Sequence, residues 1–511
     1  MGNGIYGLNS VEILSVKEGT RNKHFEDDAS VVEKIVNSIG PKLREASAAR
    51  REATSFTIYR APKAMRQANA KGFKPQLVSI GPYHIKNKEL KAMQGRKLEH
   101  LQSILLRNPK RELKDYVEEM KKLEGRAKKC YSDDQSTSSS YLGGIEFVEM
   151  MLLDGCFLVE MFLRSEEKEL QHFDLCWMQH LVSFDMLLLE NQLPFFVLEA
   201  IFRFVRENQQ GPLASTSSLE DLALDCYQLV NVMPLNEDAK SKDSYHHLLD
   251  LVHHHCLPQP SNESEAAAAA HSSSSTSRPK SKPDMEERIP SDRWDLEEGA
   301  WRTAQPLEKL LLADNAAADD KEKREIFAIP SAEQLQDSGM KFKRKENGGN
   351  GGSFLDIRYE KKGVIEIPYL NFSDDHMSIF QNLIAYEQCC PVGTFFTAYA
   401  FFMDDIINTG KDVRILRHSE ILEHGLGSDE ELAQHVNQLG KGVFYDEGRI
   451  HLYEERMGIT KYSRDPKNIW RETMNRKYFH SPWAKLSLGG AILGLSLSIL
   501  QAALSIYSTL T

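Results

Sequence analysis

The sequence lacks a cysteine pattern that would indicate a disulfide framework or a zinc site. It contains seven scattered cysteines in 511 residues, and none forms a CxxC pair, so a zinc ribbon or thioredoxin-type site has no support. Several cysteines lie in apolar runs, where the thiol behaves as a small buried hydrophobe. An apolar N-terminal stretch is also missing, which argues against a cleaved secretory signal. We therefore expect reduced thiols in a cytosolic body.

An excess of basic residues is missing as well. The chain has 63 Lys and Arg against 74 Asp and Glu, which gives a net charge of −11. A general nucleic-acid binder needs a basic face for the phosphates, so no nucleic-acid partner is expected. The hydrophobic content of 41% excludes both a disordered chain and a multi-pass transporter. The length allows about two to four domains.

Signatures of catalysis are scarce, and we predict no catalytic, cofactor-binding or metal-ligating residues. There is no GxSxG elbow, and the glycine-rich residues 347–353 lack the Lys-Ser/Thr of a phosphate loop. A histidine cluster would fan around a helix axis instead of converging, and it encloses an ordinary apolar stripe. A helix is therefore favoured over a metal site for this cluster, which comprises His246, His247, His253, His254, His255 and Cys256.

Asp404, Asp405 and Asn408 form the strongest alternative. Acidic and amide groups at i, i+1 and i+4 on a helix could bind Mg²⁺ and a diphosphate, as in terpene cyclases. A cyclase also needs a second acidic metal motif downstream, and no convincing one is present. A solvated helix edge is therefore favoured. A Mg-dependent enzyme that uses these three residues stays open as the alternative function.

The segment Leu486 to Leu510 is uncharged and mostly apolar. About twenty apolar residues cross the hydrocarbon core of a bilayer. Basic residues precede the segment and almost nothing follows it, so the positive-inside rule leaves the body in the cytoplasm. We therefore expect one C-terminal transmembrane helix that makes this a single-pass protein of the plasma membrane. The alternative is a buried core helix, and a glycan at the sequons of Asn262 or Asn371 would refute the cytoplasmic body.

The fold class is expected to be mainly α: a helical soluble body with a small β-hairpin, split by a disordered linker, plus the C-terminal transmembrane helix. Helical periods are expected at 89–130, 145–163, 173–204 with a new helix at Pro194, 219–257, 377–388, 394–409 and 428–439. Two β-like runs, 354–357 and 364–367, flank a Lys-Lys-Gly turn. The expected parts are an N-terminal arm (1–54), a first helical portion (55–257), a low-complexity linker (258–300), a second portion with the hairpin (301–484) and the anchor (485–511).

Several strings, taken together and in order, resemble the plant family called domain of unknown function 247. The opening block is Ile58 to Pro62, followed by Val78 to His84, and the next is Leu153 to Phe157. The most diagnostic block is Asp185 to Pro194. Later blocks are Ile329 to Ala332, Asp356-Ile357, Ile367-Pro368, Asn382 to Cys389, Phe402 to Asp404, Tyr478-Phe479 and Ser481 to Ala484.

The resemblance implies a plant protein that is mostly helical and has a C-terminal membrane anchor, with no established activity or catalytic residues. Some grass members are linked to gametophytic self-incompatibility as pollen-side determinants, and others to signalling or defence. The function expected is a non-enzymatic, membrane-anchored recognition or signalling protein with an unidentified protein partner. Glu190, Asn191 and Gln192 of the diagnostic block are expected to cap helix ends and to satisfy backbone groups, in preference to holding a ligand.

Overall fold

The structure is a computed structural model of the chain. It describes residues 34, 36–42, 56–132, 143–167, 176–207, 217–229, 234–236, 239, 241–258, 329–346, 352–444, 451–478 and 482–510. The chain divides into two units, Met1–Phe56 and Thr57–Thr511. The expected linker, apart from its first residue, and most of the expected N-terminal arm lie outside the described residues, so both stay predictions.

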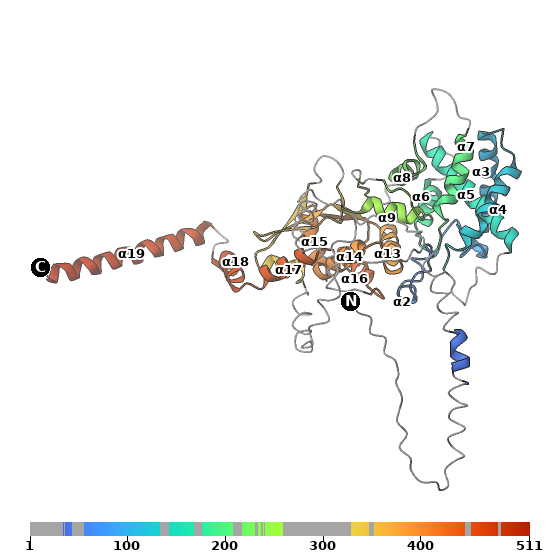
Figure 1. Cartoon of the computed structure of the whole chain (residues 1–511). Helices are drawn as coiled ribbons and strands as arrows, with labels where there is room; N and C mark the ends of the chain where they lie inside the picture. Colours follow the sequence, from blue (N-terminus) through green and yellow to red (C-terminus); the bar gives the residue numbers. More distant parts are fainter. Residues whose placement is uncertain are drawn as a thin grey trace, which may run out of the picture. The chain divides into compact units, whose positions relative to one another are not determined.

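The first helical group surrounds α5 (Gly144–Glu166), which confirms the helix expected at 145–163. Its apolar residues occur on all sides, as is typical of a helix enclosed by others. It contacts α3 (Gln94–Arg107), α4 (Leu113–Lys128), α7 (Phe195–Arg206) and α8 (Leu219–Leu229) (Figure 1). The short helices α2 (Lys63–Ala68) and η1 (Lys88–Met93) precede this group in the chain.

The apolar segment 173–204 is divided, as expected, before a new helix at its proline. α6 (Cys176–Asp185) ends at Asp185, and Pro194 is the N-cap of α7. Proline is tolerated at a helix start because its missing N–H would have no helical partner there. The segment 219–257 forms α8 and α9 (Leu248–Cys256), which confirms one or two helices in that region.

The second helical group follows residue 329 in the chain. α13 (Asp374–Cys389), α14 (Phe395–Ile406) and α16 (Asp429–Leu439) confirm the three helices expected there, and they contact one another. Aromatic rings fill the space beside them; Phe380, for example, stacks on Tyr399 with centroids 5.8 Å apart. Helices that the sequence analysis did not identify are α12 (Ala332–Asp337), α15 (Gly410–His418), α17 (Tyr453–Ser463) and α18 (Pro466–Tyr478).

The expected hairpin is present, but its first strand lies further along the chain. β2 (Arg358–Glu360) pairs antiparallel with β3 (Val364–Pro368) around Lys361-Lys362-Gly363. β1 (Lys341–Lys345) adds a parallel strand on the other side of β3, which gives the order β1-β3-β2. β4 (Leu370–Phe372) and β5 (Leu422–His424) form a second, two-stranded parallel sheet.

The predicted transmembrane anchor is the main correction to the expected fold class. The C-terminal segment is helical, as α19 (Pro482–Leu510). Among the described residues, however, no helix combines the length and apolar character needed to cross a membrane. The transmembrane helix at Leu486 to Leu510 and the single-pass membrane localisation are therefore wrong for the chain as described.

Several acidic residues in the apolar helices are buried. Asp154 and Glu160 of α5 are 2% and 1% exposed. Lys97 Nζ donates to Asp154 Oδ1 at 2.5 Å, and Arg107 Nε donates to Glu160 Oε2 at 2.6 Å. A buried carboxylate is tolerated only when a cation and hydrogen bonds compensate for its lost hydration. These pairs thus explain how such apolar helices accommodate acidic residues.

An irregular stretch, residues 72–81, is fixed by side chains of the diagnostic block; we call this contact region the polar junction. Asp185 accepts from three successive backbone N–H groups, those of Gln76 (2.8 Å), Leu77 (2.7 Å) and Val78 (2.8 Å). Asn191 Oδ1 accepts from Ile80 N–H at 2.7 Å, and Asn191 Nδ2 donates to Val78 O at 3.0 Å. A segment outside helices and sheets needs such partners, because its buried backbone groups have none of their own.

Two further side chains join other parts of the chain to the polar junction. Gln192 Nε2 donates to Leu188 O (2.8 Å), while its Oε1 accepts from Leu249 N–H of α9 at 3.1 Å. Asn382 of α13 accepts from Leu189 N–H at 2.8 Å and donates to Gly72 O at 2.7 Å. The structural role expected for Asn191 and Gln192 agrees with these contacts.

Glycine at position 81 should be required by the polar junction. Gly81 has φ +74°, and an added Cβ would lie 2.4 Å from Gln192 O. We expect Gly81→Ala to lower the free energy of unfolding by at least about 2 kcal/mol, from the left-handed backbone and the clash together. Chemical denaturation measures this. The control is Gly95→Ala in α3, where nothing lies within 4 Å. Equal stability of the two variants would contradict the prediction.

The charge of Asp185 should make stability depend on pH. Burial raises the pKa of Asp185 to about 6, although the three N–H bonds oppose the shift. The folded state then binds this proton more tightly than the unfolded state, so its stabilising contribution is complete below about pH 4 and is lost as the pH rises to about 6. Two pKa units correspond to about 3 kcal/mol.

Unfolding free energies of the native chain and of Asp185→Asn, measured between pH 4 and pH 6.5, test this dependence. Other titrating groups are common to both proteins, so their effects cancel in the difference. We expect the native chain to lose about 2 kcal/mol relative to the variant over this range, most of the full shift. A difference that stays constant with pH would show that Asp185 is not the titrating group.

Candidate functional site

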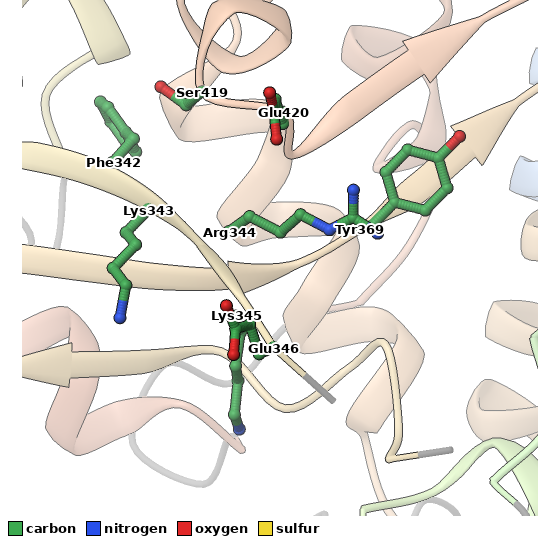
Figure 2. Close-up of a pocket in the computed structure, with 8 residues that line it drawn as sticks. All are labelled: Phe342, Lys343, Arg344, Lys345, Glu346, Tyr369, Ser419 and Glu420. Atoms are coloured by element: carbon green, nitrogen blue, oxygen red, sulfur yellow. The ribbon is translucent and has the colours of Figure 1, made fainter. Parts of the chain in front are cut away.

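A hollow of about 780 Å³ lies beside the edge strand β1. This volume falls within the roughly 300–1,000 Å³ of sites that hold small ligands. Five of its lining residues are consecutive and extend along β1, while Tyr369 follows β3 and two residues precede β5 (Figure 2). The lining residues are Phe342, Lys343, Arg344, Lys345, Glu346, Tyr369, Ser419 and Glu420; we call this space the β1 hollow.

The β1 hollow follows the edge of the strand. Successive side chains of a strand point to opposite faces, so a hollow on one face would be lined by alternate residues only. Figure 2 shows Lys343 and Lys345 pointing away from the side on which Phe342 and Arg344 lie. Because all of these residues line the same space, that space extends along the edge. β1 is also the terminal strand of its sheet, so no described strand covers this edge.

Arg344 is the cation of the hollow that is least compensated by acidic groups. Its guanidinium lies over the ring of Tyr369, 4.6 Å from the centroid, an arrangement in which the ring face attracts a cation. Tyr369 in turn donates its hydroxyl to Glu423 Oε2 at 2.7 Å, which fixes the ring. Within the described parts of the chain, Arg344 forms no ion pair. Its N–H donors are therefore positioned and available to an anionic group.

The neighbouring lysines are already paired with carboxylates. Lys343 Nζ donates to Glu366 Oε1 across the sheet at 2.7 Å, and this bond raises the pKa of Lys343. Lys345 pairs with Asp356, but burial outweighs the pairing and lowers the pKa of Lys345. Both lysines are therefore held by carboxylates, whereas Arg344 forms no ion pair with a described residue.

Glu420 forms part of the opposite wall and has an uncommon backbone conformation. It follows α15 with φ 57°, a region where glycine is usual and where other residues incur a cost of about 1–3 kcal/mol. Its N–H donates to Arg417 O at 3.0 Å, which closes the last turn of the helix. The left-handed conformation at this position is that of a helix C-terminal cap, since Ile421 N–H also donates to Leu416 O at 3.1 Å.

The acidic motif considered for Mg²⁺ does not converge in the structure. α14 ends at Ile406, so Asn408 lies beyond the helix and the i, i+4 geometry is lost. Asp405 is paired with Arg456 of α17, and burial raises the pKa of Asp404. Throughout the described residues, no group of three or more His, Cys, Asp or Glu side chains could hold a metal ion.

The histidine cluster is used in packing. His247 Nε2 donates to Thr57 O at 3.0 Å, and burial lowers the pKa of this imidazole to about 4. His253 Nε2 donates to Glu387 Oε1 at 3.0 Å, and His255 contacts the hydroxyl of Tyr245 at 3.2 Å. His247, His253 and His255 thus each contact a different partner, at the start of α9 and along it.

Glu190, Asn191 and Gln192 bond to backbone groups of the fold and do not line the β1 hollow. Glu190 accepts from Ala61 N–H and from Arg60 Nη1, both at 3.1 Å. Burial raises the pKa of Glu190, against the opposing charges of Arg60 and Arg66. Glu190 therefore joins the opening block of the chain to the polar junction.

Sequence reasoning missed the β1 hollow entirely. The only available signal was the run Lys341 to Lys345 (KFKRK), four cations around one apolar residue in an otherwise acidic chain. Alternation in this run is incomplete, because Lys343 and Arg344 are adjacent polar residues, so it does not satisfy the period-2 pattern of a strand. Its partners Tyr369, Ser419 and Glu420 are too distant in sequence to be associated with it without the structure.

Comparisons with known proteins support the resemblance noted in the sequence. No solved structure matches the chain significantly. UPF0481 protein At3g47200 of Arabidopsis thaliana is 28% identical over 469 residues, which cover 89% of this chain and 87% of the relative. Putative UPF0481 protein At3g02645 of the same plant is 24% identical over 534 aligned positions, with 95% and 96% coverage. The family profile DUF247, described as a plant protein of unknown function, matches residues 58–497, and the chain therefore belongs to this plant family.

Proposed function

We propose that the protein is a non-enzymatic recognition protein that binds an acidic segment of a partner protein in the β1 hollow. The observation that carries the proposal is Arg344, which is held against Tyr369 and lines the hollow without forming an ion pair to any described residue, although Glu346 and Glu420 also line it. Arginine in such a position suits a carboxylate, because its planar guanidinium can donate two parallel hydrogen bonds. An enzyme that uses Asp404, Asp405 and Asn408 has less support, since Asp405 already pairs with Arg456.

The polar residues of the family blocks support the non-enzymatic part of the proposal. Asp185 uses both carboxylate oxygens to accept backbone N–H groups. Glu387 accepts from Phe396 N–H at 2.9 Å and from Thr397 N–H at 2.8 Å, at the start of α14. Their hydrogen-bonding capacity is thus engaged in supporting the backbone, which leaves recognition to the exposed strand.

A narrower proposal is that this recognition serves gametophytic self-incompatibility on the pollen side, as the family resemblance implies for some grass members. It predicts expression in pollen and inheritance together with the incompatibility type. Transcript profiling across tissues and segregation analysis measure both. Uniform expression in all tissues would contradict this narrower proposal and leave the binding proposal unaffected.

Reversal of the charge at Arg344 should abolish most of the binding. The probe is a fluorescein-labelled peptide of alternating Glu and Val, and its affinity for the full chain is measured by fluorescence anisotropy. We expect Arg344→Glu to weaken binding at least about tenfold, because an attraction is replaced by a repulsion. Arg344→Lys keeps the charge but loses the planar stacking, so a loss of about two- to fivefold is expected.

The matched control is Lys361→Glu, the same charge reversal at an exposed lysine in the β2–β3 turn, outside the hollow. It changes the net charge of the chain by the same amount, so it measures the general electrostatic effect. We expect its affinity to stay within about twofold of the native value. If both reversals weaken the peptide equally, or if the native chain does not bind it, the proposed site is wrong.

A further inference from the structure

We infer that the partner segment binds as an additional β-strand on the open edge of β1. This inference rests on the proposed function and specifies how the acidic segment is held. Strand addition supplies affinity through main-chain hydrogen bonds, while side chains supply specificity. It requires an accessible strand edge with free backbone groups, space beside that edge, and side chains that select the incoming sequence.

The backbone groups of β1 meet the first requirement. Lys341 N–H donates to Gly363 O at 2.9 Å, and β1 is parallel to β3 with Lys341 opposite Val364. In a parallel ladder, the N–H and C=O of alternate residues point to the same neighbouring strand. The groups of Lys341, Lys343 and Lys345 therefore point to β3. Those of Phe342 and Arg344 point to the other edge of β1, where no strand of the described residues pairs with them.

The β1 hollow meets the second requirement. It follows the edge of the strand over residues 342–346, and its opposite wall contains Ser419 and Glu420 (Figure 2). Adjacent strands in a sheet lie about 4.8 Å apart, so an incoming strand would occupy the space immediately beside β1. The wall at Ser419 and Glu420 then limits how far that strand extends away from the sheet.

The side chains select an acidic strand over a second copy of β1. Residues directly opposite each other on neighbouring strands point to the same face and interact, so a glutamate opposite Arg344 would meet its guanidinium beside Tyr369. A second β1 would bring its own cations against Lys341, Lys343 and Arg344, and like charges on neighbouring strands repel. Lysines on an edge strand protect against such self-pairing, and the same charges favour an acidic partner.

Backbone methylation of the peptide tests the inference directly. Three versions of the Glu/Val peptide are compared on the full chain: unmodified, N-methylated at the glutamates, and N-methylated at the valines. In an antiparallel addition, the peptide glutamate opposite Arg344 exchanges both main-chain hydrogen bonds with it. N-methylation of the glutamates removes the N–H of that pair and should therefore weaken binding at least about tenfold. In a parallel addition, the flanking residues make those bonds, so the methylated valines should weaken binding by this factor.

A strong effect of one methylated set, with the other within about twofold of the unmodified peptide, supports strand addition and gives its direction. Equal affinity of all three peptides overturns it. That result leaves the proposed function intact, since the unmodified peptide still binds and still depends on Arg344. An unmodified peptide that does not bind overturns both.

Hydrogen exchange of the protein provides a second and independent measurement. Strand addition should slow the exchange of the Phe342 and Arg344 amides at least about tenfold when the unmodified peptide is saturating, because these N–H groups gain acceptors. The Lys343 amide, which is directed to β3, should change much less. Binding through side chains alone would leave all three amides unchanged, and that outcome contradicts the inference.

Discussion

The polar junction is the constraint on which the rest of this structure depends. Residues 72–81 have no helix or sheet to satisfy their backbone, yet their buried part must be hydrogen-bonded. Asp185 and Asn191 supply those bonds, and Asn382 connects the same stretch to α13 of the second helical group. Loss of one member would leave several buried groups without partners, which costs more than the single bond is worth. The segments before and after the expected linker are thereby held together through polar contacts as well as apolar packing.

This constraint also accounts for the acidic residues in the most apolar helices. Asp154 accepts from Gly81 N–H at 2.9 Å while it pairs with Lys97, and Lys97 also donates to Ser79 O at 2.6 Å. Buried ion pairs contribute little net stability, but removal of one partner leaves an uncompensated charge. The pairs therefore specify which arrangement of the segments is compatible with a buried core.

The polar side chains of the family blocks and those of the β1 hollow lie in separate parts of the structure. The polar side chains that carry the family resemblance hold backbone segments in place, and their donors and acceptors are engaged there. The β1 hollow, in contrast, is built from an edge strand and two distant turns, and it contains Arg344, which has no ion-pair partner in the described part of the chain.

The sequence by itself determined the helical class, the positions of the long helices and the family. Those features depend on local periodicity and on short motifs, as with α5 and the helix start at Pro194. Local patterns did not show which acidic residues are buried. They also did not predict the strand β1, and they led to a transmembrane helix at the C-terminus that the structure does not support. Only the tertiary structure decided that Asp154 meets Lys97 and that Arg344 meets Tyr369 beside an open edge, because both contacts join residues that are far apart in the chain and become neighbours only when the segments pack.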